Sequence, residues 1–122
     1  MDDLWGEIRE TMRTLDEVMD KCAEIGERLV SAEAAYYTAK AKATFELKEQ
    51  GYAATLIQQI VKGVDSELAR KYRVTEVSEA MTDYHRAEVE YENAKEARNV
   101  CKKKLAMLND QYNREWNSGG YR

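Results

Sequence analysis

Proline is absent from the 122-residue chain, and glycine occurs only 6 times. Both residues interrupt helices, so their scarcity favours long, uninterrupted helices. β-branched residues do not alternate with polar ones at period two, which leaves no candidate strand. Ala, Glu, Lys, Leu and Arg dominate instead, as in coiled coils. The sequence therefore predicts an all-α fold in a single domain over residues 1–122.

Signals for particular compartments or ligands are also missing. No apolar run approaches the roughly 18 residues of a membrane span, and acids stand where a signal peptide has basic residues. The net charge of -4 gives no general attraction to nucleic acid or to an anionic membrane. The cysteines, Cys22 and Cys101, lack metal-ligand or CxxC spacing. We expect a cytoplasmic protein with no cofactor and no metal, whose two cysteines are small apolar core residues.

The first half of the chain repeats apolar residues in alternating steps of three and four, which is the spacing of a coiled-coil seam. This seam comprises Trp5, Ile8, Met12, Leu15, Met19 and Cys22, followed by Ile25, Leu29, Ala32, Tyr36, Ala39, Ala43 and Leu47. Two consecutive steps of three between Met19 and Ile25 predict a local overwinding of the supercoil. A helix is expected over about residues 3–49, with Asp3 as its N-cap and Gly51 as its left-handed terminator.

A second seam predicts a helix over about residues 75–117, followed by a frayed tail over 118–122. Its members are Val77, Ala80, Tyr84, Ala87, Tyr91, Ala94, Arg98, Cys101, Leu105, Leu108 and Tyr112, and Trp116 extends it. The apolar phase slips between Arg73 and Thr75, where we expect a break. The tip, residues 52–73, should hold short helices over 53–62, closed by Gly63, and about 66–72, capped by Asp65 or Ser66.

The two seams match best if the long helices lie antiparallel. Trp5 then lies near Trp116, Cys22 near Cys101, and Gly26 opposite Arg98, where the glycine leaves room for the longer side chain. Residues 1–34 hold ten acids and four bases, and they face residues 96–122, with six bases and three acids. We predict a long antiparallel coiled-coil hairpin with one or two short helices at its tip. A homodimer is also expected, because a lone helix pair buries little apolar surface.

The sequence offers few residues for catalysis. The single histidine, His85, is followed by Glu88 in an HxxE pattern, whereas metal sites in helical bundles use ExxH with further carboxylates. A solvated or tyrosine-stacked surface histidine beside Tyr84 is the preferred interpretation. No phosphate-binding glycine loop, GxSxG or zincin motif occurs. We therefore expect a protein that is not an enzyme.

Charged clusters have ordinary explanations in a coiled coil. Lys102, Lys103 and Lys104, with Arg98 and Arg114, form a basic cluster that would face the acidic first helix. Direct binding to nucleic acid is therefore not expected. The acids of the first helix fit a solvated, lysine-facing surface better than an imitation of a phosphate backbone, although both interpretations use the same residues.

The longest run without a charge, GYAATLIQQIV, lies at the predicted chain reversal. Exposed apolar and aromatic residues often anchor protein interfaces. The candidate partner-binding residues are Tyr52, Leu56, Ile57, Ile60 and Val61 in this run, together with the exposed Tyr37. The alternative is that the apolar residues of the run fold back and cap the end of the coiled coil. The sequence does not separate these two roles.

Two segments carry a resemblance to a known group of proteins. GYAATLIQQIVKG, with Gly51, Ala54, Thr55, Leu56 and Ile57, and EARNVCKKKLAMLNDQYNREW, with Lys102, Arg114, Glu115 and Trp116, resemble small helical proteins encoded by bacteriophages and prophages of Gram-positive bacteria. The resemblance covers about half the chain and implies a phage context. It implies a protein that binds and inhibits or redirects a host factor, including a nucleic-acid-handling defence enzyme such as a CRISPR nuclease. The alternative is a helical scaffold or accessory protein of phage DNA replication, recombination or assembly.

Overall fold

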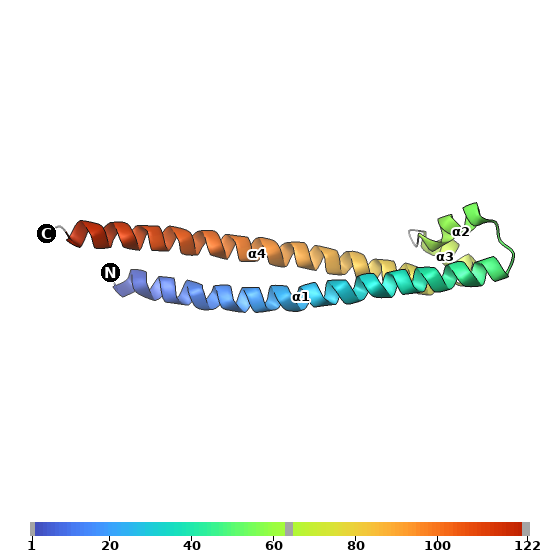
Figure 1. Ribbon diagram of the computed structural model, residues 1–122, viewed down its shortest axis with the longest axis horizontal. Coiled ribbons are helices and arrows are strands. Elements are labelled where there is room, and N and C mark those ends of the chain that lie inside the picture. Colours follow the sequence, from blue (N-terminus) through green and yellow to red (C-terminus); the bar gives the residue numbers. More distant parts are fainter. Residues whose placement is uncertain (1, 63–64, 121–122) are drawn as a thin grey trace. The chain divides into compact units, whose positions relative to one another are not determined.

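The chain is all-α in the computed structural model, which describes residues 2–62 and 65–120. The helices are α1 (Asp2–Glu49), α2 (Ala54–Val61), α3 (Ser66–Lys71) and α4 (Thr75–Gly120). The two long helices pack antiparallel with the short helices between them, which confirms the predicted helical hairpin (Figure 1). Two compact units each contain a segment of both long helices. We call residues 2–25 with 91–120 the terminal unit, and residues 26–62 with 65–90 the tip unit.

The predicted helix ends are correct to within a few residues. The helix α1 already includes Asp2, so Asp3 lies inside the helix and is not its N-cap. The predicted tail is wrong over residues 118–120, because α4 continues to Gly120. Glycine weakens a helix by only about 1 kcal/mol per residue, and no proline follows to end it. The rest of the predicted tail, residues 121 and 122, and the predicted closing Gly63 lie outside the described residues.

A left-handed glycine ends α1, as predicted. Gly51 has a φ of 85°, and its N–H donates to the carbonyl oxygen of Lys48 at 3.0 Å. The next N–H, from Tyr52, donates to the carbonyl oxygen of Leu47 at 3.2 Å. These two bonds form a Schellman motif, which satisfies carbonyl groups that the helix end leaves free.

The same motif ends α3 and produces the predicted break. Arg73 occupies the left-handed position with a φ of 61°, and its N–H donates to the Arg70 carbonyl oxygen at 3.2 Å. Val74 N–H donates to the Ala69 carbonyl oxygen at 2.8 Å. An arginine is strained in this region of backbone space, where glycine is not. The chain therefore turns here at some conformational cost before α4 begins at Thr75.

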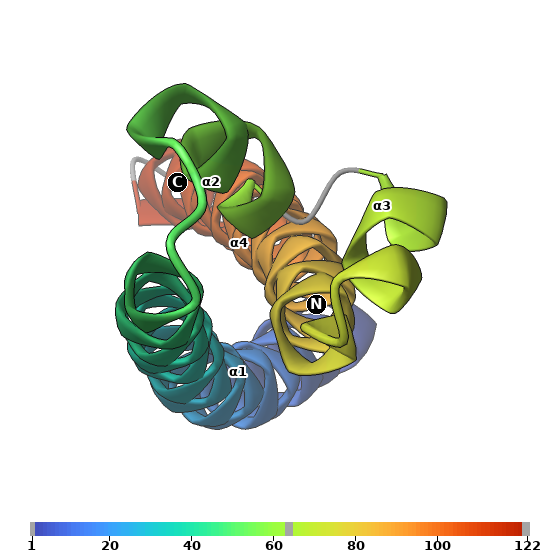
Figure 2. The same ribbon diagram turned by 90° about the vertical axis from the view of Figure 1, so that its right-hand side faces the viewer.

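The tip unit contains a core to which every helix contributes. Its buried members are Tyr36, Ala43, Leu47, Ile57, Ile60, Val61, Ala69, Val74 and Val77. Figure 2 shows α2 and α3 beside the adjoining ends of the long helices. The Asp65 carboxylate caps α3 by accepting from the N–H groups of Glu67 at 3.0 Å and Leu68 at 3.1 Å, as one of the two predicted caps. Tyr36 Oη donates to the carbonyl oxygen of Lys62 at 3.2 Å, which fixes the end of α2 against α1.

The buried face of α1 differs from the predicted seam at its start. Trp5, Met12 and Met19 are exposed, and the preceding residues are buried or half-buried instead. The inward-facing residues are Leu4, Ile8, Thr11, Leu15, Val18, Cys22, Ile25, Leu29, Ala32, Tyr36, Ala39 and Ala43. Their steps alternate between four and three without interruption, so the predicted local overwinding is wrong. The packing therefore follows one line of residues from Leu4 to Ala43, although the exposed Trp5, Met12 and Met19 are larger than Leu4, Thr11 and Val18.

The helix pairing in the terminal unit differs from the predicted register. Arg98 Nη1 lies 3.9 Å from Cys22 Sγ and not opposite Gly26. The Trp5 ring packs on Tyr112, with centroids 5.7 Å apart, and not on Trp116. Cys101 Sγ donates to the Thr11 carbonyl oxygen at 3.7 Å, so the predicted match of Cys101 with Cys22 is not the contact that forms.

Candidate protein-interaction surfaces

The apolar residues of α2 are part of the protein's own core. Ile57, Ile60 and Val61 are only 1–3% exposed, so the expectation that they present an exposed surface to a partner is wrong. Leu56 is half-buried and packs against the same core. An amphipathic helix of eight residues is not stable alone in water, so its apolar side packs on the nearest apolar surface, which the long helices provide. The capping alternative therefore describes these four residues.

The two predicted aromatic residues of the tip unit are accessible. Tyr37 is 54% exposed, and its ring lies 5.4 Å from that of Tyr36. Tyr52 is also exposed, and its ring lies perpendicular to that of Tyr72 at a centroid distance of 5.2 Å. Both rings are held by a neighbouring tyrosine and keep a free face. Their role in binding a partner stays a prediction.

His85 is the tyrosine-stacked surface histidine that the sequence favours. Its ring lies parallel to Tyr84 at a centroid distance of 6.0 Å, and Nδ1 lies 3.0 Å from Glu88 Oε1. Within residues 2–62 and 65–120, no three His, Cys, Asp or Glu side chains are grouped so that they could hold a metal ion. Partial burial, followed by the Glu33 and Glu88 carboxylates, raises the pKa of Tyr84 above its ordinary value of 10.0.

A guanidinium group lies within the seam of the terminal unit. Arg98 is half-buried, and its Nε is buried without a hydrogen-bond partner in the described structure. Cys22 and Cys101 are buried free thiols, which confirms their prediction as small core residues. Among the described residues, the only polar contact of Arg98 across the seam is the long one to Cys22 Sγ, which is a weak acceptor. The arginine is therefore poorly satisfied where it lies.

One turn before Arg98, a lysine is better satisfied. Lys95 Nζ lies 2.9 Å from Glu92 Oε1 and 5.1 Å from the centre of the Tyr91 ring. The hydrogen bond to Glu92 raises the pKa of Lys95 above its ordinary 10.5. Lys95 therefore stays charged beside the seam at neutral pH.

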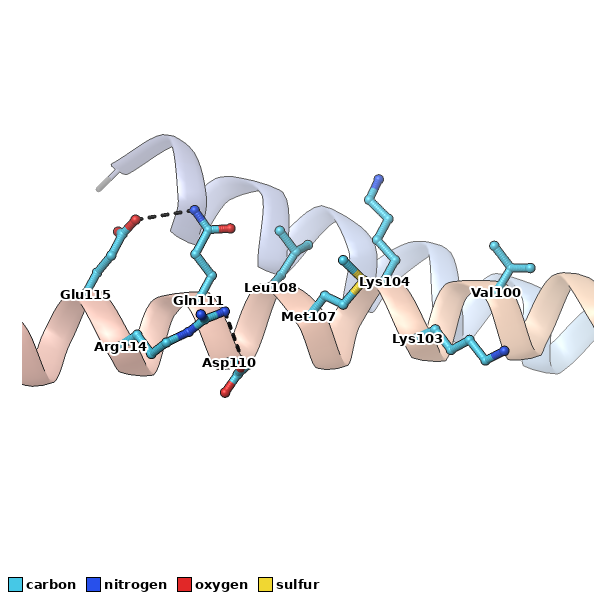
Figure 3. Close-up of a pocket in the computed structure, with 9 residues that line it drawn as sticks. All are labelled: Val100, Lys103, Lys104, Met107, Leu108, Asp110, Gln111, Arg114 and Glu115. Atoms are coloured by element: carbon cyan, nitrogen blue, oxygen red, sulfur yellow. Dashed lines mark hydrogen bonds and ion pairs between the residues drawn. The ribbon is translucent and has the colours of Figure 1, made fainter.

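A hollow of about 810 Å³ lies along α4 in the terminal unit and has an apolar floor. Val100 and Met107 are exposed, Met107 to 72%, and Leu108 is half-buried. We call these three residues and their rim the α4 patch (Figure 3). The rim comprises Lys103, Lys104, Asp110, Gln111, Arg114 and Glu115. Arg114 pairs with Asp110 at 3.1 Å, whereas Lys103 and Lys104 form no ion pair within the described residues, so the rim carries uncompensated positive charge.

The α4 patch is not among the surfaces predicted from the sequence. The interpretation of residues 102–104 as a basic surface facing α1 left out Val100 and Met107, which lie before and after the lysines in the sequence. Val100 and Met107 lie seven residues apart and off the seam. A second apolar heptad line beside a seam is the signal that could have found them.

A second exposed apolar surface lies on α1. Trp5, Met12 and Met19 are each 45–49% exposed and lie seven residues apart. We call these three residues the α1 stripe. They directly follow the inward-facing residues Leu4, Thr11 and Val18, so they flank the seam.

No helix in the described part of the chain has the length and apolar character required to cross a bilayer. Comparison of the chain with protein-family models, curated protein sequences and solved structures finds no match. The resemblance to phage-encoded helical proteins therefore stays a prediction.

Proposed function

We propose that this chain is a non-catalytic protein-binding module whose partner docks on the α4 patch. The observation that carries this proposal is the exposure of Val100 and Met107 on a hollow floor rimmed by charged side chains. An apolar centre with a polar rim is the ordinary anatomy of a protein interface. The flexible methionine side chain can adapt to the surface of a partner.

The charges of the rim indicate the kind of partner segment. Lys103 and Lys104 have no ion-pair partner in the described structure and lie on either side of the apolar floor. An amphipathic segment with apolar residues flanked by carboxylates complements this arrangement. In the phage context that the sequence suggests, the partner is a host factor that the protein inhibits or redirects, such as a defence enzyme.

Affinity capture from host lysate tests the proposal. Wild-type protein should retain a partner from the lysate. The double variant Val100→Glu, Met107→Glu should retain at least tenfold less of that partner. A single Val89→Glu variant provides the control, because Val89 is equally exposed on α4 but lies in the tip unit. Equal loss in the control, or capture unaffected by the double variant, contradicts a role for the α4 patch. Recovery of phage replication or virion proteins instead of a host enzyme would favour the scaffold or accessory role.

A further inference from the structure

We propose that the α1 stripe is a self-association surface, on which α4 of a second copy lies antiparallel to α1. The starting observation is the thin core of the terminal unit. Its buried apolar residues are Leu4, Ile8, Cys22, Ile25 and Cys101, and the larger core cluster belongs entirely to the tip unit. Two helix segments with so small a core need a further layer for stability.

The spacing of the α1 stripe identifies a helix as its occupant. Trp5, Met12 and Met19 repeat at seven residues, in the same phase as the seam beside them. Side chains at this spacing form a line along one side of a helix, with about 10 Å between neighbours. A second helix can contact each of these residues along its length, whereas a compact pocket on a globular partner cannot contact all three.

The chain carries a complementary surface on α4. Its members are Asn99, Lys102, Ala106, Asn109, Asn113 and Trp116, which are all exposed and recur at steps of three and four. We call this surface the low-charge strip, because Lys102 is its only charged residue. Small and uncharged side chains leave room for the protruding Met12 and Met19. Trp116 is exposed at the level where Trp5 packs on Tyr112.

Both surfaces lie on one side of the helix pair. The α1 stripe follows Leu4, Thr11 and Val18 in sequence, and the low-charge strip has Lys102 and Asn109 in the same position after Cys101 and Leu108. In an antiparallel pair, residues that follow equivalent seam positions flank the same side of the seam. Two copies can therefore meet face to face by a two-fold rotation, with each α1 on the other copy's α4.

Charge selects this arrangement over α1 lying on α1. Residues 1–34 hold ten acids and four bases, so two such segments repel each other. Residues 96–122, with six bases and three acids, attract them. The antiparallel direction also places Asp16 within a turn of Lys102 of the second copy and keeps Arg9 away from Lys102. A parallel direction would instead place Arg9 near Lys102 and move Asp16 away.

Symmetry separates this proposal from stacking of the α1 stripe on the α4 patch. Lys104 and Gln111 of the patch precede the seam residues Leu105 and Tyr112, so the patch flanks the opposite side of the seam. Contacts between opposite sides repeat without closing and form open chains of copies. Contact between like faces closes at two, and it leaves the α4 patch free for another protein.

Sedimentation velocity of the full chain tests the self-association. We expect a particle of twice the 14.1 kDa chain mass, which the pair Met12→Lys, Met19→Lys converts to a monomer of unchanged helix content. Trp116→Lys, which changes the opposing surface on α4, should weaken the dimer at least tenfold. The control pair Val30→Lys, Val89→Lys changes apolar residues of the tip unit that are even more exposed, and it should leave the dimer intact. A monomeric wild type, or a dimer that tolerates the methionine variants, overturns the proposal.

Disulfide trapping tests the arrangement of the copies. In a Cys22→Ala, Cys101→Ala background, chains with Asp16→Cys and chains with Lys102→Cys should cross-link when mixed and not when separate. Cross-linking within the Asp16→Cys protein alone would place α1 on α1 and overturn the arrangement. Assemblies that grow with concentration and dissolve on Met107→Lys would show open stacking, which also overturns it.

Discussion

At the scale of single residues, Arg98 is the side chain least suited to its surroundings. It interrupts an otherwise apolar seam, and its buried Nε has no partner among the described residues. An unsatisfied buried donor costs about 1–3 kcal/mol, and apolar replacements of buried charges are often stabilising. A seam of this kind retains such a residue at the expense of stability, and one use of it is to fix helix register.

Replacing Arg98 with leucine should therefore stabilise the protein by about 1–2 kcal/mol. Urea denaturation followed by far-UV circular dichroism measures the change. Arg86→Leu serves as the control, because Arg86 is exposed on the same helix and pairs only with the nearby Asp83. A lower stability for the Arg98→Leu protein would contradict this prediction. It would mean that the contact with Cys22 stabilises the protein by more than the unsatisfied Nε destabilises it.

Tyr84 should make the protein sensitive to alkali. Its pKa is raised in the folded protein, so the folded state holds the phenol proton more tightly than the unfolded chain does. This contribution to stability is complete below about pH 10, the unfolded pKa, and is lost as pH rises through the folded value. Tyr84→Phe should therefore lose less stability than wild type between pH 9 and pH 11. Parallel denaturation curves at the two pH values provide the measurement, and equal losses would contradict it.

At the scale of helices, the two Schellman motifs place different residues in the same left-handed backbone conformation. Gly51 adopts a positive φ without strain, whereas Arg73 does so with a side chain. No atom lies within 4 Å of a Cβ built at Gly51, so an added methyl group would meet only the backbone preference. The two positions therefore isolate the energetic effect of one backbone conformation.

Opposite substitutions at these turns should have opposite effects. Gly51→Ala should destabilise the protein by about 1 kcal/mol, because a left-handed conformation penalises a side chain. Arg73→Gly should stabilise it by about 0.5 kcal/mol, since the relief of strain is partly offset by the entropy of an unfolded glycine. Thermal unfolding of both variants measures the pair. Shifts of melting temperature in the same direction would refute the backbone explanation.

The sequence predicted helices more reliably than it predicted their faces. The second seam, from Val77 to Tyr112, was correct because only one line of apolar residues runs along the whole of this part of α4, with Arg98 as its one interruption. At the start of α1 two lines exist, one residue apart, and the large side chains of Trp5, Met12 and Met19 favoured theirs over the line of Leu4, Thr11 and Val18, which contains a polar threonine. The interruption that the wrong line required was the available warning, since the correct line continues into Ile25 without one.

The candidate sites were harder to predict than the fold. The uncharged run of the tip correctly indicated a buried or interfacial helix, but only the packing of Ile57 and Ile60 into the core decides between these roles. Val100 and Met107 lie off the correctly predicted seam of α4, but their apolar character alone does not show which other helix, if any, covers them. A local pattern gives the period of a helix, whereas neighbouring helices decide which side is covered.

At the scale of the whole molecule, the two units should differ in local stability. The tip unit has contributions from four helices to its core, and the terminal unit has two helix segments and few buried apolar residues. Local opening follows the number of buried apolar contacts. At concentrations too low for self-association, amides of α2 and of residues 36–47 and 77–84 should exchange with deuterium slowest. Slower exchange over residues 8–22 would contradict this ranking.

Trp5 and Trp116 are the only tryptophans in the sequence, and both belong to the terminal unit. The tip unit carries tyrosines instead. Emission excited at 295 nm, where tyrosine hardly absorbs, therefore comes from the terminal unit alone. A melting curve recorded by fluorescence reports the unfolding of that unit, whereas ellipticity at 222 nm averages over every helix. The two native tryptophans thus act as a fluorescent probe of the terminal unit. A difference between the two melting curves would show, without an added dye, that the terminal unit and the rest of the protein unfold at different temperatures.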